Sequence, residues 1–168
     1  DRADRVGPTR ITAAGWATPR EVRIAAVIVF GMALLGGAVL VWLGGLAILA
    51  LGLLSLLFAW GYSGGSSPLS HGPWGEAFVL LFFGLVAVAG TYYLQAGAWS
   101  LATLPAGLAM GSMAAAVLLL NNYRDLAADA AAGRHTLAAV LGPAGARWLY
   151  AMLLLLPCLL MTLLWWIF

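Results

Sequence analysis

Five stretches of this chain contain no charged residue, and each is long enough to cross a lipid bilayer. They are residues 24–43, 46–62, 77–93, 101–120 and 149–168. A membrane helix needs about 20 mainly apolar residues, with about 17 as the lower limit. Backbone groups in lipid must form their hydrogen bonds within the protein, and these runs lack the alternation of barrel strands. The sequence therefore predicts an all-α, polytopic transmembrane bundle with five helices in a single membrane domain.

The charged residues gather in three segments, and these segments predict how the chain is oriented. One segment precedes the first run, Glu76 lies between the second and third runs, and the last segment lies between the fourth and fifth. In a chain that crosses the membrane back and forth, all three face the same side. Because all eight basic residues are arginines in these segments, the positive-inside rule predicts that this side is cytoplasmic. The few arginines at helix ends indicate orientation rather than binding to nucleic acid.

Two patterns of small residues predict close contacts between helices. Gly107 and Gly111 lie four positions apart in the fourth run, and Ala33 and Gly37 do so in the first. Small residues at this spacing let two helix backbones approach each other in a membrane. We therefore expect these residues to pack against neighbouring helices rather than to bind a ligand.

A polar motif follows the fourth apolar run directly. Asn121, Asp125 and Asp129 are spaced by four residues, so they lie on one face if the helix continues past Leu120. Asn122 lies close to the same face. Two carboxylates one turn apart suit a hard cation with oxygen ligands, and Mg²⁺ is usually completed by water and substrate phosphates. The motif therefore predicts a site where Mg²⁺ meets an anionic group at the membrane surface.

Two arginines accompany these acids and are expected to bind phosphate oxygens. The planar guanidinium groups of Arg124 and Arg134 present paired donors that match phosphate oxygens. A simpler interpretation stays open, in which each arginine pairs with its neighbouring aspartate as ordinary surface charge. Five alanines around the acids and the paired asparagines favour a ligand site.

Five other polar residues allow more than one interpretation. Glu76 fits the first turn of the third helix, where an acid complements the helix dipole, although a catalytic role stays open. His135 is interpreted as a solvated loop residue rather than a phosphate donor. Arg147 marks an interface and the orientation of the chain. Asp1 and Asp4 are either metal ligands from a second loop or solvated charges.

These residues resemble a known family. Residues 121–137, which read Asn-Asn-Tyr-Arg-Asp-x-x-x-Asp-x-x-x-Gly-Arg-x-Thr-Leu, are similar to the second aspartate-rich motif of the UbiA superfamily of intramembrane prenyltransferases. Residues 60–65 with Pro68-Leu69, and the helix at residues 75–93, resemble its branch that acts on 1,4-dihydroxy-2-naphthoate in menaquinone synthesis. Residues 1–10 resemble the end of the first aspartate-rich region.

The sequence departs from the family pattern at a few positions. Arg134 stands where members usually have Lys, Val140 where they have Arg, and Ser66 where they have Pro. The core of the first aspartate-rich motif belongs upstream of Asp1. Members have about nine membrane helices, so we expect this chain to be a central fragment that does not catalyse alone.

The resemblance implies a reaction and a set of site residues. In such enzymes, Mg²⁺ ions held by two aspartate-rich loops bind polyprenyl diphosphate, whose tail lies between helices. Loss of diphosphate gives an allylic cation, which the dihydroxynaphthoate ring attacks with loss of carbon dioxide to form demethylmenaquinol. The implied metal ligands are Asp125, Asp129 and Asp1. The implied diphosphate-binding residues are Asn121, Asn122, Arg134, Arg5 and Arg10. The implied catalytic residues are Asp125, Asp129, Arg124 and Tyr62, the last positioning the aromatic substrate or the reacting carbon.

Two alternatives to this function remain. In the first, the protein is a prenyltransferase of the same family that uses another aromatic compound as the acceptor. A non-catalytic membrane protein, such as a transporter or an assembly subunit, would also explain the hydrophobicity and the sidedness. Transport favours polar groups near the middle of the bilayer, whereas the five runs carry no charge. We therefore expect a prenyltransferase in the cytoplasmic (inner) membrane of a prokaryote, with its polar loops facing the cytoplasm.

Overall fold

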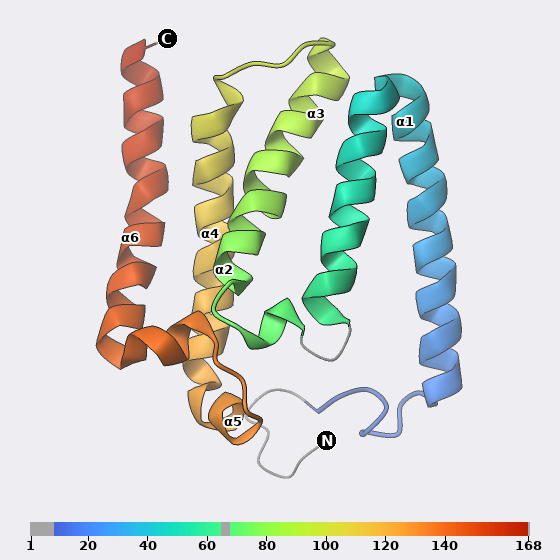
Figure 1. Ribbon diagram of the computed structural model, residues 1–168, viewed down its shortest axis with the longest axis vertical. Coiled ribbons are helices and arrows are strands. Elements are labelled where there is room, and N and C mark those ends of the chain that lie inside the picture. Colours follow the sequence, from blue (N-terminus) through green and yellow to red (C-terminus); the bar gives the residue numbers. More distant parts are fainter. Residues whose placement is uncertain (1–8, 65–67, 168) are drawn as a thin grey trace.

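The computed structural model describes residues 9–64 and 68–167, and within these ranges every regular element is a helix (Figure 1). The elements, in chain order, are α1 (Pro19–Ser63), the 3₁₀ turn η1 (Leu69–His71), α2 (Gly75–Val79), the π-helix η2 (Leu80–Val86), α3 (Ala87–Ala96), α4 (Thr103–Arg124), α5 (Leu126–Ala131) and α6 (Leu137–Ile167). Four helical segments of the described chain are long and apolar enough to cross a membrane: Pro19–Ser63, Gly75–Ala96, Thr103–Arg124 and Leu137–Trp166. The predicted class, an all-α transmembrane bundle, is confirmed.

Helix α1 contains the first two of the five predicted runs. Its start is set by Thr18, whose side chain accepts a hydrogen bond from the Glu21 amide while the Glu21 carboxylate accepts one from the Thr18 amide. This capping box satisfies amide groups that a helix start otherwise leaves unpaired. At Gly45 the backbone has φ 66° and ψ −154°, values that favour glycine. The chain reverses there, so α1 consists of two antiparallel limbs (Figure 1).

The next crossing is built from α2, η2 and α3 in succession, and it packs very closely on α4. A Cβ atom added to Gly84 would lie 2.4 Å from the Gly107 carbonyl oxygen and 2.6 Å from the Gly111 Cα atom. The predicted contact at Gly107 and Gly111 is therefore confirmed. The second pattern of small residues, Ala33 and Gly37 in α1, shows no such contact. A Cβ atom added to Gly37 would have no described neighbour within 4 Å. The expectation of close packing there is wrong for the described residues.

Helix α6 begins earlier than the apolar run at residues 149–168 indicates. It starts at Leu137, is interrupted at Gly142 (φ 67°, ψ 174°) and continues with Pro143 as the first residue of its long limb. Proline is tolerated there because the first helical residue needs no amide donor. Arg147 consequently lies inside the helix, where its Nη1 donates to the Tyr123 hydroxyl at 3.1 Å.

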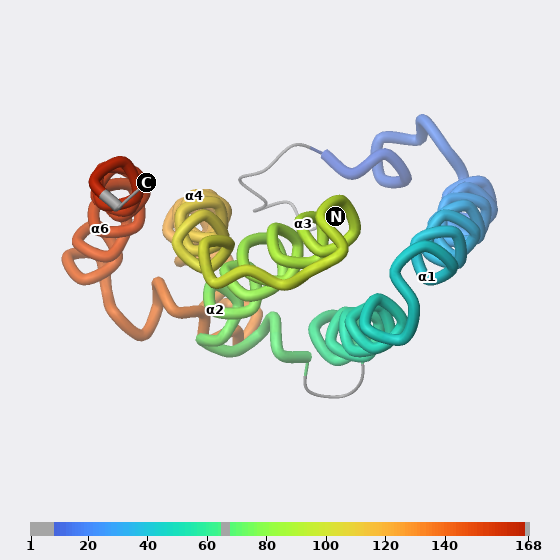
Figure 2. Tube along the Cα trace, turned by 90° about the horizontal axis from the view of Figure 1, so that it is seen from above, coloured from blue at the N-terminus to red at the C-terminus, as the bar shows by residue number. Residues whose placement is uncertain are grey.

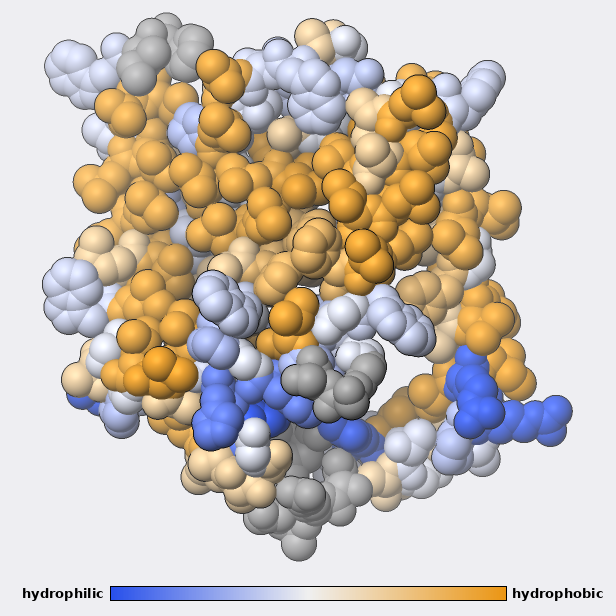
Figure 3. All heavy atoms as spheres, viewed as in Figure 1, coloured by the Kyte–Doolittle hydropathy of each residue, from blue (hydrophilic) through white to orange (hydrophobic). Residues whose placement is uncertain are grey.

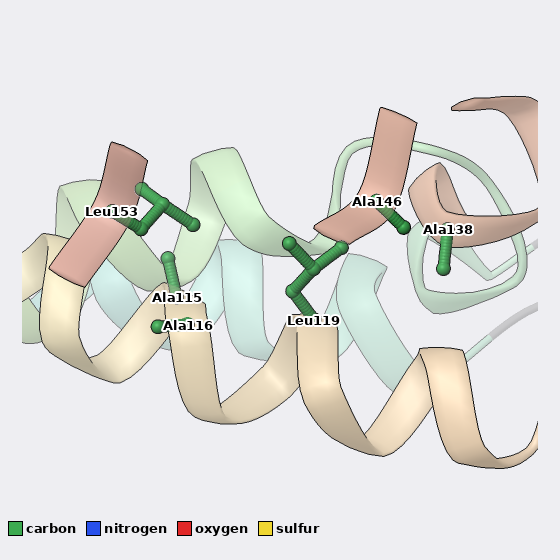
Figure 4. Packing of buried hydrophobic residues seen from close by; sticks show 6 residues of the cluster. All are labelled: Ala115, Ala116, Leu119, Ala138, Ala146 and Leu153. Carbon is green, nitrogen blue, oxygen red and sulfur yellow. The ribbon is translucent and has the colours of Figure 1, made fainter. Parts of the chain in front are cut away.

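The core of the described chain is small and lies between α4 and α6. Its buried apolar members are Ala115, Ala116, Leu119, Ala138, Ala146 and Leu153 (Figure 4). Most large apolar side chains are instead exposed, including Trp42 at 84% and Leu46 at 82%. They form a hydrophobic band over the upper part of the molecule, whereas hydrophilic residues gather at its lower end (Figure 3). An apolar surface of this kind suits lipid or further helices rather than water.

The helices form a curved row, and their polar connections lie at one end. From above, α6, α4, the crossing Gly75–Ala96 and the two limbs of α1 follow one another along this curve (Figure 2). Residues 9–18, η1 and α5 lie at the lower end of the bundle, while the reversal within α1 and the α3–α4 connection lie at the upper end (Figure 1). For the described residues, this arrangement confirms that the charged segments share one side.

A substitution at the closest helix contact tests this packing. Gly84→Ala places a methyl group against the Gly107 and Gly111 backbone, which cannot yield as a flexible side chain would. We expect a loss of about 1–3 kcal/mol of stability, as for an overpacked core, measured as a lower midpoint of thermal unfolding in detergent. The control is Gly31→Ala, because a Cβ atom there meets no described atom within 4 Å. Equal unfolding midpoints for the two variants would contradict the packing described here.

Candidate active site at the polar end of the bundle

The acidic motif forms a bend between α4 and α5. Helix α4 continues past Leu120 to Arg124, as the motif requires, and Asp125 then leaves the helical conformation (φ −95°, ψ 11°). The hydrogen bonds between residues four positions apart nevertheless continue through the bend. The Asp125 amide donates to the Asn121 carbonyl at 3.0 Å, and the Asp129 amide donates to the Asp125 carbonyl at 2.8 Å. The three polar positions therefore follow one another turn by turn, around a bend rather than along a straight helix.

Asp129 is the buried acid of this motif. Its side chain is 7% exposed, and its Oδ1 accepts a hydrogen bond from Arg134 Nη1 at 2.9 Å. Its Oδ2 is buried without a hydrogen-bond partner among the described residues, and so is Arg134 Nε. A buried carboxylate needs compensation by a charge or by hydrogen bonds. Arg134 supplies half of that compensation and leaves one oxygen available.

Asp125 lies nearer the surface than Asp129. Its two carboxylate oxygens accept hydrogen bonds from Arg124 Nε at 2.8 Å and Nη2 at 2.9 Å. The side chains of the arginine and the aspartate are 49% and 33% exposed. The simpler interpretation, in which each acid pairs with its own arginine, is thus correct about the pairing. The pair is partly solvated, so its hydrogen bonds contribute little to stability.

The loop after α1 is fastened to the acidic motif by two hydrogen bonds. Arg134 Nη2 donates to the Ser70 carbonyl at 3.0 Å, and the His135 amide donates to the His71 carbonyl at 2.7 Å. The His135 side chain itself is exposed, as expected of a solvated loop residue. Arg134 therefore joins two segments that lie 64 residues apart.

Glu76 is the residue that the sequence interpretation undervalued. It lies in the first turn of α2 as predicted, but it is only 4% exposed and its Oε1 accepts a hydrogen bond from Asn122 Nδ2 at 2.9 Å. Its Oε2 is buried without a partner among the described residues. One signal was present in the sequence, because Glu76 is the only charged residue between Arg23 and Arg124.

Tyr62 lies beside an apolar cavity of about 500 Å³ between α1 and the crossing Gly75–Ala96. The cavity is lined by Ser55, Phe58, Ala59, Tyr62, Ser63, Phe78, Val79, Phe82, Phe83 and Ala87. The rings of Phe58, Phe78 and Phe82 form a cluster with centroid separations of 5.3 to 6.3 Å. The Tyr62 hydroxyl lies next to α2, 3.5 Å from the point where a Cβ atom on Gly75 would stand.

The remaining candidate residues lie at the surface or outside the described residues. Asn121 is exposed near the end of α4, and Arg10 is exposed in the segment before α1. Asp1, Asp4 and Arg5 lie outside the described residues. The structure therefore brings together Asn122, Asp129 and Arg134 with Glu76, Tyr62 and the loop 68–74.

The acids of the motif fit a cation of the Mg²⁺ type. The unpartnered Asp129 Oδ2 and the partly exposed Asp125 carboxylate are oxygen donors one turn apart. The described residues contain no group of three or more His, Cys, Asp and Glu side chains suited to hold a metal ion. Two carboxylates match an ion that keeps several waters and is completed by substrate phosphates.

Comparison with known proteins identifies a family. A sequence profile with the description "UbiA prenyltransferase family" matches residues 1–168. The chain is 42% identical over 151 residues to a Mycobacterium tuberculosis protein named 1,4-dihydroxy-2-naphthoate octaprenyltransferase, covering 90% of this chain and 52% of that protein. It is 36% identical over 167 residues to the Escherichia coli protein of the same name, covering 95% and 54%.

A more distant relative is the rat UbiA prenyltransferase domain-containing protein 1, which is 34% identical over 145 residues and is covered over 43% of its length. The chain thus spans about half the length of the first two relatives. No solved structure matches it significantly.

The double attachment at Arg134 and His135 leads to a prediction about loop 68–74. Arg134→Gln removes the guanidinium that holds the Ser70 carbonyl, so we expect roughly tenfold faster amide hydrogen exchange in the peptides covering residues 69–74 and 133–137. Mass spectrometry of the protein in nanodiscs measures this exchange. The control is Arg147→Gln, which instead loses the bond to the Tyr123 hydroxyl on α4. Unchanged protection in Arg134→Gln would show that the loop is held by other contacts.

Proposed function

The chain belongs to the UbiA prenyltransferase family, and from this premise we propose that it forms part of an intramembrane prenyltransferase. The proposed reaction is the Mg²⁺-dependent transfer of a polyprenyl group from polyprenyl diphosphate to 1,4-dihydroxy-2-naphthoate, with loss of carbon dioxide, to give demethylmenaquinol. The observation that carries this proposal is the buried Asp129 carboxylate, whose free oxygen lies in a motif rich in acids, amides and arginines at a membrane helix end.

Each polar residue of the motif has a role in binding the diphosphate. Asp125 and Asp129 would hold the cation, together with Asp1 from the segment before α1. Bound Mg²⁺ neutralises negative charge on the diphosphate and makes it a better leaving group. Once a cation compensates the acids, Arg124 and Arg134 can direct their donors to phosphate oxygens. Arg5 and Arg10 would add weaker contacts to the same anion.

The two asparagines complete the motif. Asn122 donates its amide N–H to Glu76, which leaves its carbonyl oxygen free to contact a cation or a hydroxyl group. Asn121 is exposed beside it and would donate to a phosphate oxygen. Neutral amides suit this location because they bind either a metal or a phosphate without adding charge.

The apolar cavity would hold the reacting end of the prenyl group. Its walls are almost entirely apolar, and Tyr62 lies at the end near α2. An aromatic face near the allylic carbon stabilises developing positive charge, and the phenylalanine cluster keeps water away from it. The rest of the chain would extend between helices into lipid.

The identity of the acceptor and the orientation of the site are also proposals. Relatives at 42% and 36% identity are named for 1,4-dihydroxy-2-naphthoate, which favours that acceptor. The arginines of the described residues occur in segments that lie at one end of the bundle, which favours a site facing the cytoplasm.

Replacing either acid of the motif tests the proposed site. Asp129→Asn and Asp125→Asn keep a hydrogen-bond acceptor for the arginines but remove the negative charge that holds the cation. In the intact protein we expect prenyl transfer to fall by at least about 100-fold, the loss typical of removing a key electrostatic group, while membrane insertion and protein level stay normal. The control is Glu21→Gln, which alters an exposed carboxylate in the capping box of α1. Full activity in both aspartate variants would exclude the assigned site.

A comparison of acceptors separates the proposed reaction from its alternatives. Purified intact protein is supplied with Mg²⁺, a polyprenyl diphosphate and either 1,4-dihydroxy-2-naphthoate or 4-hydroxybenzoate. We expect one diphosphate and one carbon dioxide to be released for each prenylated naphthoate formed, and little product from hydroxybenzoate. A preference for hydroxybenzoate would show that the enzyme uses a different acceptor from the one proposed. If no acceptor leads to release of diphosphate, the protein is better explained as a non-catalytic membrane protein.

A further inference from the structure

Glu76 has a free carboxylate oxygen that the proposed diphosphate site does not use. The side chain is 4% exposed, and only Oε1 has a hydrogen-bond partner, namely Asn122. Oε2 is buried and has no partner among the described residues. A buried carboxylate that lacks part of its hydrogen bonding is destabilising. An unpaired oxygen at this position therefore indicates that a further group binds there.

The position of Glu76 limits what that group can be. On one side it is bonded to Asn122 of the acidic motif. On the other side, the Tyr62 hydroxyl at the end of the apolar cavity lies close to the residue that precedes Glu76, namely Gly75. Glu76 is therefore located between the proposed diphosphate site and the proposed site of the reacting carbon.

The chemistry of a carboxylate excludes several ligands at this position. A diphosphate or a second carboxylate would be repelled, because like charges at close range in a poorly hydrated site are strongly unfavourable. A metal ion would have only Oε2 to bind, because Oε1 accepts the hydrogen bond from Asn122, and the Mg²⁺ dependence measured below tests for such an ion. A neutral hydroxyl group needs only that one oxygen, to which it donates a short, charge-assisted hydrogen bond.

We propose that Glu76 Oε2 binds a ring hydroxyl group of the aromatic acceptor, so that Glu76 is an acceptor-binding residue of the enzyme. This inference rests on the proposed prenyl transfer to a hydroxylated aromatic compound. The bond through Oε1 to Asn122 fixes the carboxylate relative to the diphosphate site, and thus places the acceptor ring beside the carbon that loses the diphosphate. A hydrogen bond from the hydroxyl group to a carboxylate also increases electron density on the ring that attacks.

The Glu76→Gln variant tests this assignment in the intact protein. Glutamine retains a carbonyl oxygen for Asn122, but its amide nitrogen cannot accept a hydrogen bond from a hydroxyl group. We expect the KM for the acceptor to rise about tenfold or more, the loss expected for a hydrogen bond to a charged group. The KM for polyprenyl diphosphate and the Mg²⁺ dependence should stay within about twofold, a split that general structural damage would not produce. Glu21→Gln is the matched control, and thermal unfolding checks that both variants fold.

Methylated acceptors supply a second arm that does not depend on the variant. Methylating one ring hydroxyl removes the donor, so one of the two mono-methyl ethers should lose about tenfold in kcat/KM with the unmodified protein. That ether should lose little further with Glu76→Gln, because the same hydrogen bond is already absent.

The outcomes distinguish the inference from the proposed function. An unchanged acceptor KM in Glu76→Gln, equal changes for both substrates, an altered Mg²⁺ dependence or full activity with both ethers would overturn the role of Glu76 alone. If Glu76→Gln does not fold, the ethers decide the question. If the unmodified protein transfers no prenyl group, the proposed function fails and this inference fails with it.

Discussion

The ion pair between Arg134 and the buried Asp129 holds the polar end of this protein together. The guanidinium group donates to Asp129 Oδ1 at 2.9 Å and to the Ser70 carbonyl at 3.0 Å. It thereby compensates a carboxylate that would be costly to bury alone and fastens the loop between α1 and α2 to the acidic bend. That loop connects Tyr62 with Glu76, so the same arginine links the segment beside the apolar cavity to the acids proposed to bind the cation.

The membrane environment explains why the rest of the chain is organised so differently. In lipid there is no hydrophobic driving force that would bury large apolar side chains between helices. Helix association therefore depends on close contact between small residues. Gly84 meets Gly107 and Gly111 in this way, and alanines provide much of the core between α4 and α6. The two limbs of α1 expose nearly all of their large apolar side chains. The curved row of helices (Figure 2) therefore presents extensive surfaces suited to lipid or to additional helices.

The sequence was informative wherever the evidence was local. Uncharged runs identified the membrane helices. The four-residue spacing of Asn121, Asp125 and Asp129 predicted one face of a continuing helix, whereas α4 ends at Arg124 and only the helix-like backbone hydrogen bonds continue through the bend. Long-range relations were not accessible in this way. The bond between Glu76 and Asn122 joins residues 46 positions apart, and no periodicity links them. The same holds for the two pairs of small residues at four-residue spacing. Gly111 contacts a neighbouring helix and Gly37 meets no described neighbour, because the outcome depends on which helices lie side by side. The long limb of α6 after Gly142 begins at Pro143, before the uncharged run at residues 149–168, and proline suits the first turn of a helix.

Asp125 and Asp129 acquire their proposed role only if a cation couples them to an anionic substrate. The most direct test is to titrate the intact protein with farnesyl diphosphate, at equal ionic strength, with Mg²⁺ and then with EDTA. A site in which two carboxylates share the ion with phosphate oxygens predicts saturable binding that weakens by at least about tenfold when Mg²⁺ is removed. Equal affinity under both conditions would contradict it, because the carboxylates would then have no means of attracting a diphosphate.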